Sequence, residues 1–433
     1  MTNVTFIGAG SAVFARQIMT DILAVEGLDA GEFRLVDIDE RRLDLARRMA
    51  EKLVEISGKS WNVAASTDRR QLLEGSDFVV NTVEVAGLAN VEHDYEIPLR
   101  YGVDQCIGDT IGPGGIFKAL RTGPVWLEIL RDCERLCPRA WVLNYTNPMS
   151  ILTFVALTAT SMRTVGLCHS VQSTSRLLAT YLDVPYGELR WRCAGINHNS
   201  WFIELKFDGV DLIPRLRERA RDPEIYDQDP VRFEMLLHFG AFPTESSGHF
   251  SEYVPYFRKR PDLVERYTRS GYRGESGFYA HNWPSWRRDN DRHIEEMLDG
   301  TRPIPMERSQ EYASTIVEAI QLDRPRVIHG NVRNTSLIDN LPDGCVEVAC
   351  LIDKNGVQPC WFGPLPEQLA ALNRAHMSVH ALVAQSILGR DKQAAKYALM
   401  LDPLTAAVCS PDELDGMFEE MWEAEAESLQ HFS

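Results

Sequence analysis

Two short blocks of the sequence contain groups that could bind a transition metal ion. Cys168 lies in VGLCHSVQ, and His198 lies 30 residues later in GINHNSW. Each residue ends a short apolar run, so the two side chains could meet at one edge of a sheet if both runs are strands. A thiolate and an imidazole suit ions such as Mn²⁺, Fe²⁺ or Zn²⁺, whereas Mg²⁺ and Ca²⁺ prefer oxygen ligands. A buried thiol and a hydrogen-bonded histidine are the plainer interpretation, and the spacing alone leaves both open.

The N-terminal residues have the pattern of a dinucleotide-binding turn. NVTFIGAGS is a β-branched and aromatic run that breaks at Gly8 and Gly10, and Ser11 precedes residues with helical spacing. The backbone N–H groups of such a turn and the helix dipole can bind a pyrophosphate. Asp37 ends the next predicted strand, where a carboxylate can bind the ribose hydroxyls of NAD and would repel the 2′-phosphate of NADP. Val13 stands where the third glycine of the pattern usually lies.

The elements around this turn form an alternating series of predicted strands and helices. The first strand and helix are followed by a strand at EFRLVDID, a helix at RRLDLARRMAEKLVEI, a strand near NVAAS with a helical stretch after it, and a strand at SDFVVNTV. Such a βαβ series predicts an α/β fold with a parallel sheet. We expect ligands to bind at the carboxyl edge of that sheet.

Two further segments lead to the same edge. The segment DQCIGDTIGPGG is a tight loop before an amphipathic helix, whose N-terminus could face an anion or a polar ligand; a plain loop is the alternative. The predicted strand AWVLN ends in Tyr-Thr-Asn-Pro. Asn147, held just before Pro148, could therefore make a fixed amide contact with a ligand.

Composition excludes several classes of protein. Acidic residues number 62 against 45 basic ones, the formal net charge is −17, and the densest basic run is RLRERAR, so no nucleic acid partner is expected. The sequence has neither an apolar run of about 18 residues nor a secretory signal pattern, so we expect a cytoplasmic protein with no membrane partner. Nine cysteines, scattered along 433 residues, favour reduced thiols.

The second part of the chain has a different pattern. Residues 210–310 are polar with helical spacing, as expected for helices that cap a site or contact a second subunit. CVEVACLID has strand character, and two long amphipathic helical segments follow it. We therefore divide the chain into residues 1–195, which contain the NAD site, and residues 196–433, a mixed α+β domain for substrate, metal and oligomerisation.

Taken in order, these blocks resemble one known family. It is glycoside hydrolase family 4, the NAD- and manganese-dependent glycosidases, and the similar blocks are GAGS, DID, GDTIGPGGIFKALRT, LNYTNPM, VGLCHSVQ, CAGINHNSWF, TESSGHFSEYVPYF, EYASTI, VIHGNVRNTSLIDNLPDGCVEVACLID and DPLTAAV. The melibiase-type α-galactosidase branch is the most similar. The resemblance implies a Rossmann-like N-terminal domain of the lactate/malate dehydrogenase type followed by an α+β C-terminal domain.

The resemblance implies a mechanism outside the two-carboxylate scheme of most glycosidases. In this family NAD⁺ takes hydride from C3 of the sugar, a base removes the acidified C2 proton, and the enediolate expels the aglycone. Water then adds and NADH returns the hydride. Mn²⁺ or another divalent transition metal polarises the C2 and C3 oxygens as a Lewis acid. Cys168 and His198 match the metal ligands of the family.

The resemblance also assigns roles to residues near these ligands. His169 takes the place of an aspartate that is the proposed general acid in other branches, and Asp109 is the second candidate for that role. Asn147 and Arg333 match residues that contact the substrate. For Asn147 and Arg333, the sequence alone is equally consistent with ordinary surface residues.

The candidate base is Tyr253, in the block TESSGHFSEYVPYF, with His249 and Glu252 within one helical turn of it. A tyrosine base would require a nearby metal ion to lower its pKa from the usual value of about 10. An aromatic ring packed in a pocket wall is the alternative interpretation.

We therefore predict a glycosidase that hydrolyses melibiose-like α-galactosides, with α-glucosidase, α-galacturonidase or α-glucuronidase activity as alternatives within the family. An NAD-dependent 2-hydroxyacid dehydrogenase is the alternative from another class, and a catalytically inactive sugar sensor is a third. The family suggests a homodimer or homotetramer.

Overall fold

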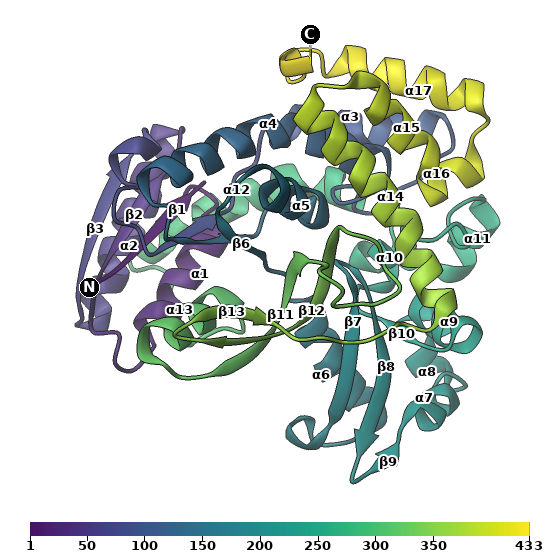
Figure 1. The fold of residues 1–433 in the computed structure, drawn as a ribbon, viewed down its shortest axis with the longest axis horizontal. Coiled ribbons are helices and arrows are strands. Elements are labelled where there is room, and N and C mark those ends of the chain that lie inside the picture. Colours follow the sequence, from purple (N-terminus) through teal and green to yellow (C-terminus); the bar gives the residue numbers. More distant parts are fainter. Residues whose placement is uncertain (433) are drawn as a thin grey trace.

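The computed structural model describes residues 1–432, apart from the side chains of residues 12 and 13. Within these residues the strands form one mixed sheet with a parallel and an antiparallel part (Figure 1). The parallel strands lie in the order β3 (Ser60–Ser66), β2 (Ala30–Val36), β1 (Thr2–Ile7), β4 (Phe78–Asn81), β5 (Trp141–Asn144) and β6 (Arg163–Gly166). This is the strand order of a doubly wound nucleotide-binding fold, and it confirms the predicted Rossmann-like α/β class.

The remaining strands extend the same sheet in antiparallel pairs. Asn331 pairs with Gly166 of β6, which joins the two parts. From that joint the order is β11 (Arg326–Arg333), β12 (Cys345–Asp353), β7 (Arg190–Ile196), β8 (Asn199–Phe207) and β10 (Phe242–Pro243), while β13 (Gly356–Pro359) pairs with β12 and β9 (Val210–Asp211) pairs with β8. The boundary predicted at residue 195 lies inside β7, whose partners β8 and β12 both belong to the antiparallel part.

Helices connect the parallel strands. Asp39 caps the N-terminus of α2 (Glu40–Ser57) by accepting a hydrogen bond from the Arg42 N–H, and Gly58 follows its last residue with φ of 65°. The other helices of this part are α1 (Ala12–Leu23), α3 (Gly87–Arg100), α4 (Gly112–Leu136), α5 (Met149–Ala159) and α6 (Ser170–Leu182). The helical stretch predicted after NVAAS is wrong: only a short 3₁₀ turn forms there, because β4 begins soon after β3 ends.

The rest of the chain is mainly helical. Its helices are α7 (Ile213–Arg219), α8 (Pro223–Tyr226), α9 (Pro230–Phe239), α10 (Ser247–Phe250), α11 (Pro261–Tyr267), α12 (Phe278–Leu298), α13 (Tyr312–Leu322), α14 (Glu367–Gly389), α15 (Lys392–Leu401), α16 (Pro403–Val408) and α17 (Pro411–Ala424). The C-terminal helices, green to yellow in Figure 1, pack against α3, α4 and α5. Among the described residues, no helix combines the length and apolarity that crossing a membrane requires.

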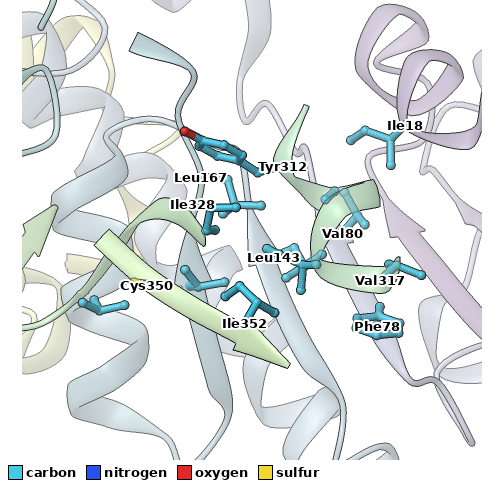
Figure 2. Close-up of a cluster of buried hydrophobic side chains, with 14 of the residues drawn as sticks. Ile18, Phe78, Val80, Leu143, Leu167, Tyr312, Val317, Ile328, Cys350 and Ile352 are labelled. Atoms are coloured by element: carbon cyan, nitrogen blue, oxygen red, sulfur yellow. The ribbon is translucent and has the colours of Figure 1, made fainter. Parts of the chain in front are cut away.

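One hydrophobic core crosses the joint between the two parts of the sheet. The cluster contains buried side chains from both parts, and those labelled in Figure 2 are Ile18, Phe78, Val80, Leu143, Leu167, Tyr312, Val317, Ile328, Cys350 and Ile352. Because an apolar contact of this kind resists relative motion, the parallel and antiparallel parts are expected to move as one body. Groups from both parts can therefore be held in fixed positions at the joint.

Candidate active site

The predicted nucleotide turn lines a cleft of about 620 Å³ at the carboxyl ends of β1, β2 and β4. Gly8, Gly10, Ser11 and Asp37 all lie on its wall. Gly8 has φ of 84°, and a Cβ there would lie 2.7 Å from the backbone carbonyl of Thr82. A Cβ at Gly10 would lie 2.7 Å from the Asp37 carboxylate. A side chain at either position would therefore collide with its neighbours, so the close packing of this turn requires glycine at both.

Asp37 holds this turn in place. Its Oδ2 accepts a hydrogen bond from the Gly10 N–H at 2.7 Å, and its Oδ1 accepts one from the Asp39 N–H at 3.0 Å. The carboxylate follows β2 and faces the cleft, where the ribose of a dinucleotide would reach it. The structure thus brings together all four residues that the sequence predicts for cofactor binding.

Another wall of the cleft comes from α12, which lies in the 210–310 region where helices that cap a site were expected, although none of its residues was singled out. Its lining residues are Tyr279, Trp283, Trp286, Arg287, Asn290 and Asp291. Asp291 Oδ1 lies 3.2 Å from Arg42 Nη2, so an ion pair ties α12 to α2 beside the nucleotide turn. The two tryptophans were a usable signal, because large aromatic rings on an otherwise polar helix often contact a ligand or a partner.

A second cavity, of about 350 Å³, adjoins the cleft. Phe14, Tyr145 and Asn147 line both spaces, which places them at the junction. Cys168 and His198 both line the second cavity. The two segments singled out by their spacing therefore face one space next to the predicted nicotinamide site.

The sheet explains why these two residues meet. Cys168 follows β6 by two residues, and His198 lies in the turn of the β7–β8 hairpin, where Ile196 pairs with Asn199. His198 has φ of 62°, a left-handed conformation that few residues other than glycine and asparagine adopt. Backbone strain of this kind at a non-glycine residue is typical of a functional position.

Electrostatics link the two side chains. Burial lowers the pKa of His198, but the negative charges of Cys168 and Glu245, with a hydrogen bond to the cysteine sulfur, outweigh it and raise the pKa to about 10. Glu245 Oε2 lies 3.5 Å from His198 Nε2. Burial raises the pKa of Glu245, but His198 and His249 lower it to about 2. The ionised Glu245 therefore gives this cavity a negative charge that favours a cation.

The donor set fits a divalent transition metal with open coordination positions. In the described part of the chain, no three His, Cys, Asp or Glu side chains are arranged to hold an ion by themselves. Cys168 and His198 offer one sulfur and one imidazole, which leaves the other positions to water or substrate oxygens. An incomplete protein shell of this kind is typical of a catalytic metal site.

Asp109 and Asn147 form a polar cluster at the cofactor side of the junction. Asn147 Nδ2 donates a hydrogen bond to Asp109 Oδ2 at 3.0 Å, and Lys118 Nζ lies 3.7 Å from the same oxygen. Burial raises the pKa of Asp109, but the charges of Lys118 and His249 lower it to about 2. Asp109 is therefore ionised near neutral pH, which favours it as an acceptor rather than a proton donor.

Lys118 is a site residue that the sequence analysis missed. It is almost fully buried on α4, its Nζ lies 2.9 Å from Glu84 Oε2, and it lines the cofactor cleft. Burial lowers its pKa, but the charges of Glu84, Tyr279 and Asp109 raise it above the usual value, so the ammonium stays charged. The signal available was its position in the first two turns of the helix that follows the glycine loop.

The two proposed proton-transfer residues have contrasting positions. His169 lines the second cavity with a half-exposed side chain, and its Nδ1 lies 3.8 Å from Glu311 Oε1. Tyr253 is buried, is not among the lining residues of either space, and its hydroxyl has no hydrogen-bond partner among the described residues. Burial and the neighbouring carboxylates raise the pKa of Tyr253 well above its usual value, opposite to what a base requires.

Tyr272 occupies the cavity wall where Tyr253 was expected, and its hydroxyl donates a hydrogen bond to Glu245 at 3.1 Å. Arg333 is not brought to the site. Its guanidinium pairs with Asp343 at 2.6 Å near the surface, and it lines neither space, because its position on β11 directs it away from the junction.

The chain is similar to glycosyl hydrolases along nearly its whole length. A sequence profile described as "Family 4 glycosyl hydrolase" matches residues 3–184, and one described as "Family 4 glycosyl hydrolase C-terminal domain" matches residues 193–405. An α-galactosidase of Bacillus subtilis is 40% identical, with 100% of each chain covered. An α-galactosidase of Rhizobium meliloti is 37% identical, with 100% of this chain and 90% of the relative covered.

Solved structures agree with this similarity. A crystal structure of a Bacillus subtilis protein described as the glucosidase lplD has a TM-score of 0.88 at 26% identity, covering 97% of this chain and 99% of that one. The 6-phospho-β-glucosidase of Thermotoga maritima, solved with manganese, NAD⁺ and glucose-6-phosphate, has a TM-score of 0.80 at 21% identity and covers 99% of both chains. At 21% identity, the similarity to the Thermotoga maritima enzyme supports the fold alone.

Proposed function

The chain belongs to the family 4 glycosyl hydrolases, and from that premise we propose that it hydrolyses α-galactosides with NAD and a divalent metal ion, Mn²⁺ first among the candidates. The main observation behind this proposal is that the candidate metal ligands and the candidate cofactor site face adjoining spaces. Cys168 and His198 line one cavity, and that cavity adjoins the cleft that contains the glycine turn and Asp37. The full-length identity to two α-galactosidases supports the choice of sugar.

The charges of the cavity favour a neutral sugar over an anionic one. Among its described lining residues, Arg232 is the single lysine or arginine, and Asp229 neutralises it through hydrogen bonds of 2.8 and 2.6 Å. The third nitrogen of Arg232 donates to Thr174 at 3.0 Å. Glu245 is ionised on the same wall. A 6-phosphate or a uronate would therefore meet the ionised Glu245 and, among the described lining residues, no unpaired lysine or arginine, which supports a galactoside over a galacturonide.

When bound, NAD would accept and return a hydride at C3 of the sugar, and the metal ion would stabilise negative charge on the C2 and C3 oxygens. The residues of the chain position these groups. Cys168 and His198 would hold the ion, and Asn147 would orient a sugar hydroxyl at the junction. Asp37 and the Gly8–Gly10 turn would bind the ribose and pyrophosphate. Lys118 keeps positive charge beside Asp109, which limits repulsion of an anionic intermediate.

For the proton transfers we propose residues that line the cavity. His169 lies at the half-exposed wall, where a leaving group would depart, and histidine is the side chain that most often serves in general acid–base catalysis. Glu245, paired with Tyr272, lies on the wall beside the metal ligands and replaces Tyr253 as the candidate base. Asp109 is retained as a hydrogen-bond acceptor rather than as an acid.

The proposal is tested with a panel of nitrophenyl α-glycosides in the presence of NAD⁺, Mn²⁺ and a thiol reductant. We expect hydrolysis of the α-galactoside, loss of activity with EDTA, recovery with Mn²⁺, and no net accumulation of NADH. A 2-hydroxyacid dehydrogenase would instead accumulate NADH with a hydroxyacid and would keep its activity in EDTA. Hydrolysis of a 6-phosphorylated or uronate member alone would overturn the choice of substrate.

Three further features belong to this proposal. We place the division of the chain before β7, between residues 184 and 190, because β7 pairs only with strands of the antiparallel part.

We propose a homodimer or homotetramer, which sedimentation analysis would test. The acidic composition and scattered cysteines support a cytoplasmic enzyme, which fractionation of cells would test.

A further inference from the structure

Two buried side chains behind the metal-binding pair have no role in the scheme above. They are His249, on the short helix α10, and Glu252, two residues after its end. Their exposed fractions are 1% and 2%, and neither lines the cofactor cleft or the adjoining cavity. A carboxylate buried to this extent is costly unless it is fully hydrogen-bonded, so its partners show what it stabilises.

Glu252 binds the loop that carries Asp109. Its Oε1 accepts hydrogen bonds from the N–H groups of Cys106 and Ile107, each at 2.6 Å, and its Oε2 accepts one from the Gly108 N–H at 3.1 Å. Three successive backbone donors on one carboxylate fix the position of this loop. The same Oε2 lies 3.1 Å from His249 Nδ1, so one carboxylate joins the loop to the imidazole.

His249 in turn contacts the metal-binding histidine. Its Nε2 lies 3.1 Å from His198 Nδ1. Thr110 Oγ1 is farther from that nitrogen, at 3.3 Å, and donates its own hydrogen to Asp109 at 2.6 Å. His198 Nδ1 is therefore the nearer polar neighbour of His249 Nε2. The other nitrogen of His198, Nε2, lies on the side of Glu245.

The carboxylate of Glu252, at the end of this series of hydrogen bonds, determines which nitrogen atoms of the two histidines carry a hydrogen. An ionised carboxylate can only accept, so His249 Nδ1 carries a hydrogen and donates it to Glu252. In a neutral His249 the lone pair is then on Nε2, which can accept only if His198 Nδ1 carries a hydrogen. A metal ion that binds His198 must displace one of its ring protons. With the hydrogen on Nδ1 held by His249, the displaced proton is the one on Nε2, and the ion binds there.

We propose that Glu252 and His249 are positioning residues that fix His198 in the tautomer whose Nε2 binds the metal ion, while the same carboxylate anchors the Asp109 loop. This inference rests on the proposed metal dependence. It adds a carboxylate–histidine–histidine relay behind a ligand that would otherwise rotate or change tautomer. Loss of such outer partners typically weakens metal binding by about 10- to 100-fold.

The test measures Mn²⁺ affinity by electron paramagnetic resonance, in which the signal of free Mn²⁺ falls as the protein binds it. His249→Gln and His249→Leu form a matched pair of similar volume, and only glutamine keeps an oxygen that can accept the hydrogen of His198 Nδ1. We expect His249→Leu to bind Mn²⁺ about 10- to 100-fold more weakly than the unmodified protein, and His249→Gln to recover most of that loss. Binding of NAD⁺, followed by fluorescence, should stay within about twofold in both variants.

Equal Mn²⁺ affinity of His249→Leu and the unmodified protein would overturn the relay and leave the proposed function intact. Absence of Mn²⁺ binding in the unmodified protein, or binding that Cys168→Ser does not weaken, would overturn the proposed metal site and the relay with it. Should His249→Leu not fold, Glu252→Gln carries the test, because it leaves both imidazole rings in place; unchanged affinity in that variant would also overturn the relay.

A double variant separates the relay from a general structural effect. If Glu252 acts on the metal through His249, then Glu252→Gln should weaken Mn²⁺ binding in the unmodified protein and add little in the His249→Leu background. Fully additive losses would show that the two residues act independently and would contradict the relay.

Discussion

The cofactor cleft and the adjoining cavity, which is the proposed metal site, are built in different ways. The core of the cleft comes from one short stretch, in which β1, the Gly8–Gly10 turn and the end of β2 supply backbone donors and Asp37. The cavity takes its groups from separated segments, with Cys168 after β6, His198 in the β7–β8 turn and Glu245 after β10. The cleft depends mainly on the backbone conformation of one segment, whereas the cavity depends on the tertiary packing of several segments. Variants should therefore affect the cleft and the cavity separately.

The variant with the largest expected effect disrupts the cavity and leaves the cleft unchanged. Cys168→Ser replaces a thiolate ligand with a hydroxyl, and the Lewis-acid stabilisation it supports is worth several kcal/mol. We expect kcat/KM for an α-galactoside to fall by on the order of 10³-fold or more. The Kd for NAD⁺, measured by fluorescence titration, should change by less than about twofold. Turnover close to that of the unmodified protein would remove Cys168 from the mechanism.

The converse variant breaks the cleft and spares the cavity. Asp37→Ala removes the acceptor of the Gly10 N–H and the predicted partner of the ribose. Hydrogen bonds to a charged group contribute about 1.5 to 3 kcal/mol, so the Kd for NAD⁺ should rise about 10- to 100-fold. Affinity for Mn²⁺, measured without NAD⁺, should not change. A parallel loss of Mn²⁺ affinity would show that the two regions are not separable.

A third variant sharpens the contrast by changing the charge of the cavity. Because Glu245 is also the candidate base, kcat/KM should fall for every substrate, and the prediction therefore concerns the ratio between two substrates. Glu245→Gln removes a carboxylate whose pKa is about 2 and which is therefore ionised throughout the neutral range. We expect the ratio of kcat/KM for an α-galacturonide to that for an α-galactoside to rise about tenfold, equivalent to about 1.4 kcal/mol of relieved repulsion. Assays with the two nitrophenyl glycosides measure this ratio, and a ratio that does not rise would remove Glu245 as the determinant of sugar charge.

The smallest expected effect concerns the wall that α12 adds to the cleft. Asp291→Asn removes the ion pair with Arg42, in which both side chains are about 16% exposed. Partly exposed pairs contribute about 0.2 to 1 kcal/mol, so the Kd for NAD⁺ should rise at most about fivefold. High salt should weaken NAD⁺ binding less in the variant than in the unmodified protein, because less of the attraction remains to be screened.

The same contrast explains what the sequence could predict. The Rossmann-like order and the cleft residues were predictable, because a glycine turn and an acidic strand end lie close together in sequence and have one structural explanation. Cys168 and His198 were predictable as a pair because a cysteine and a histidine at one sheet edge suit a transition metal ion, and because the blocks that resemble the family contain both residues. The relay of His249 and Glu252 was not, because it requires loop 106–108, α10 and the β7–β8 turn to meet in space.

Two site expectations failed to reach the cavity for local reasons. Tyr253 follows α10 closely, and its buried ring packs among Phe250, His376, His249 and His198, with its centroid 6.3 Å from that of the His198 ring but outside the lining of the cavity. Arg333 ends β11, where Asp343 before β12 neutralises it. Sequence spacing places residues on an element but does not say which face of that element meets a cavity. Lys118 and Tyr272, which do line the two spaces, were missed for the same reason.

The central claim, that one metal ion binds between a sulfur and an imidazole beside the cofactor, is tested most directly by anomalous diffraction. Crystals grown with NAD⁺ and Mn²⁺ would be measured at the manganese absorption edge. We predict one strong anomalous peak within bonding distance of Cys168 Sγ and His198 Nε2, with the nicotinamide ring at the junction lined by Asn147. A peak elsewhere in the molecule, or none next to these two atoms at saturating Mn²⁺, would contradict the account.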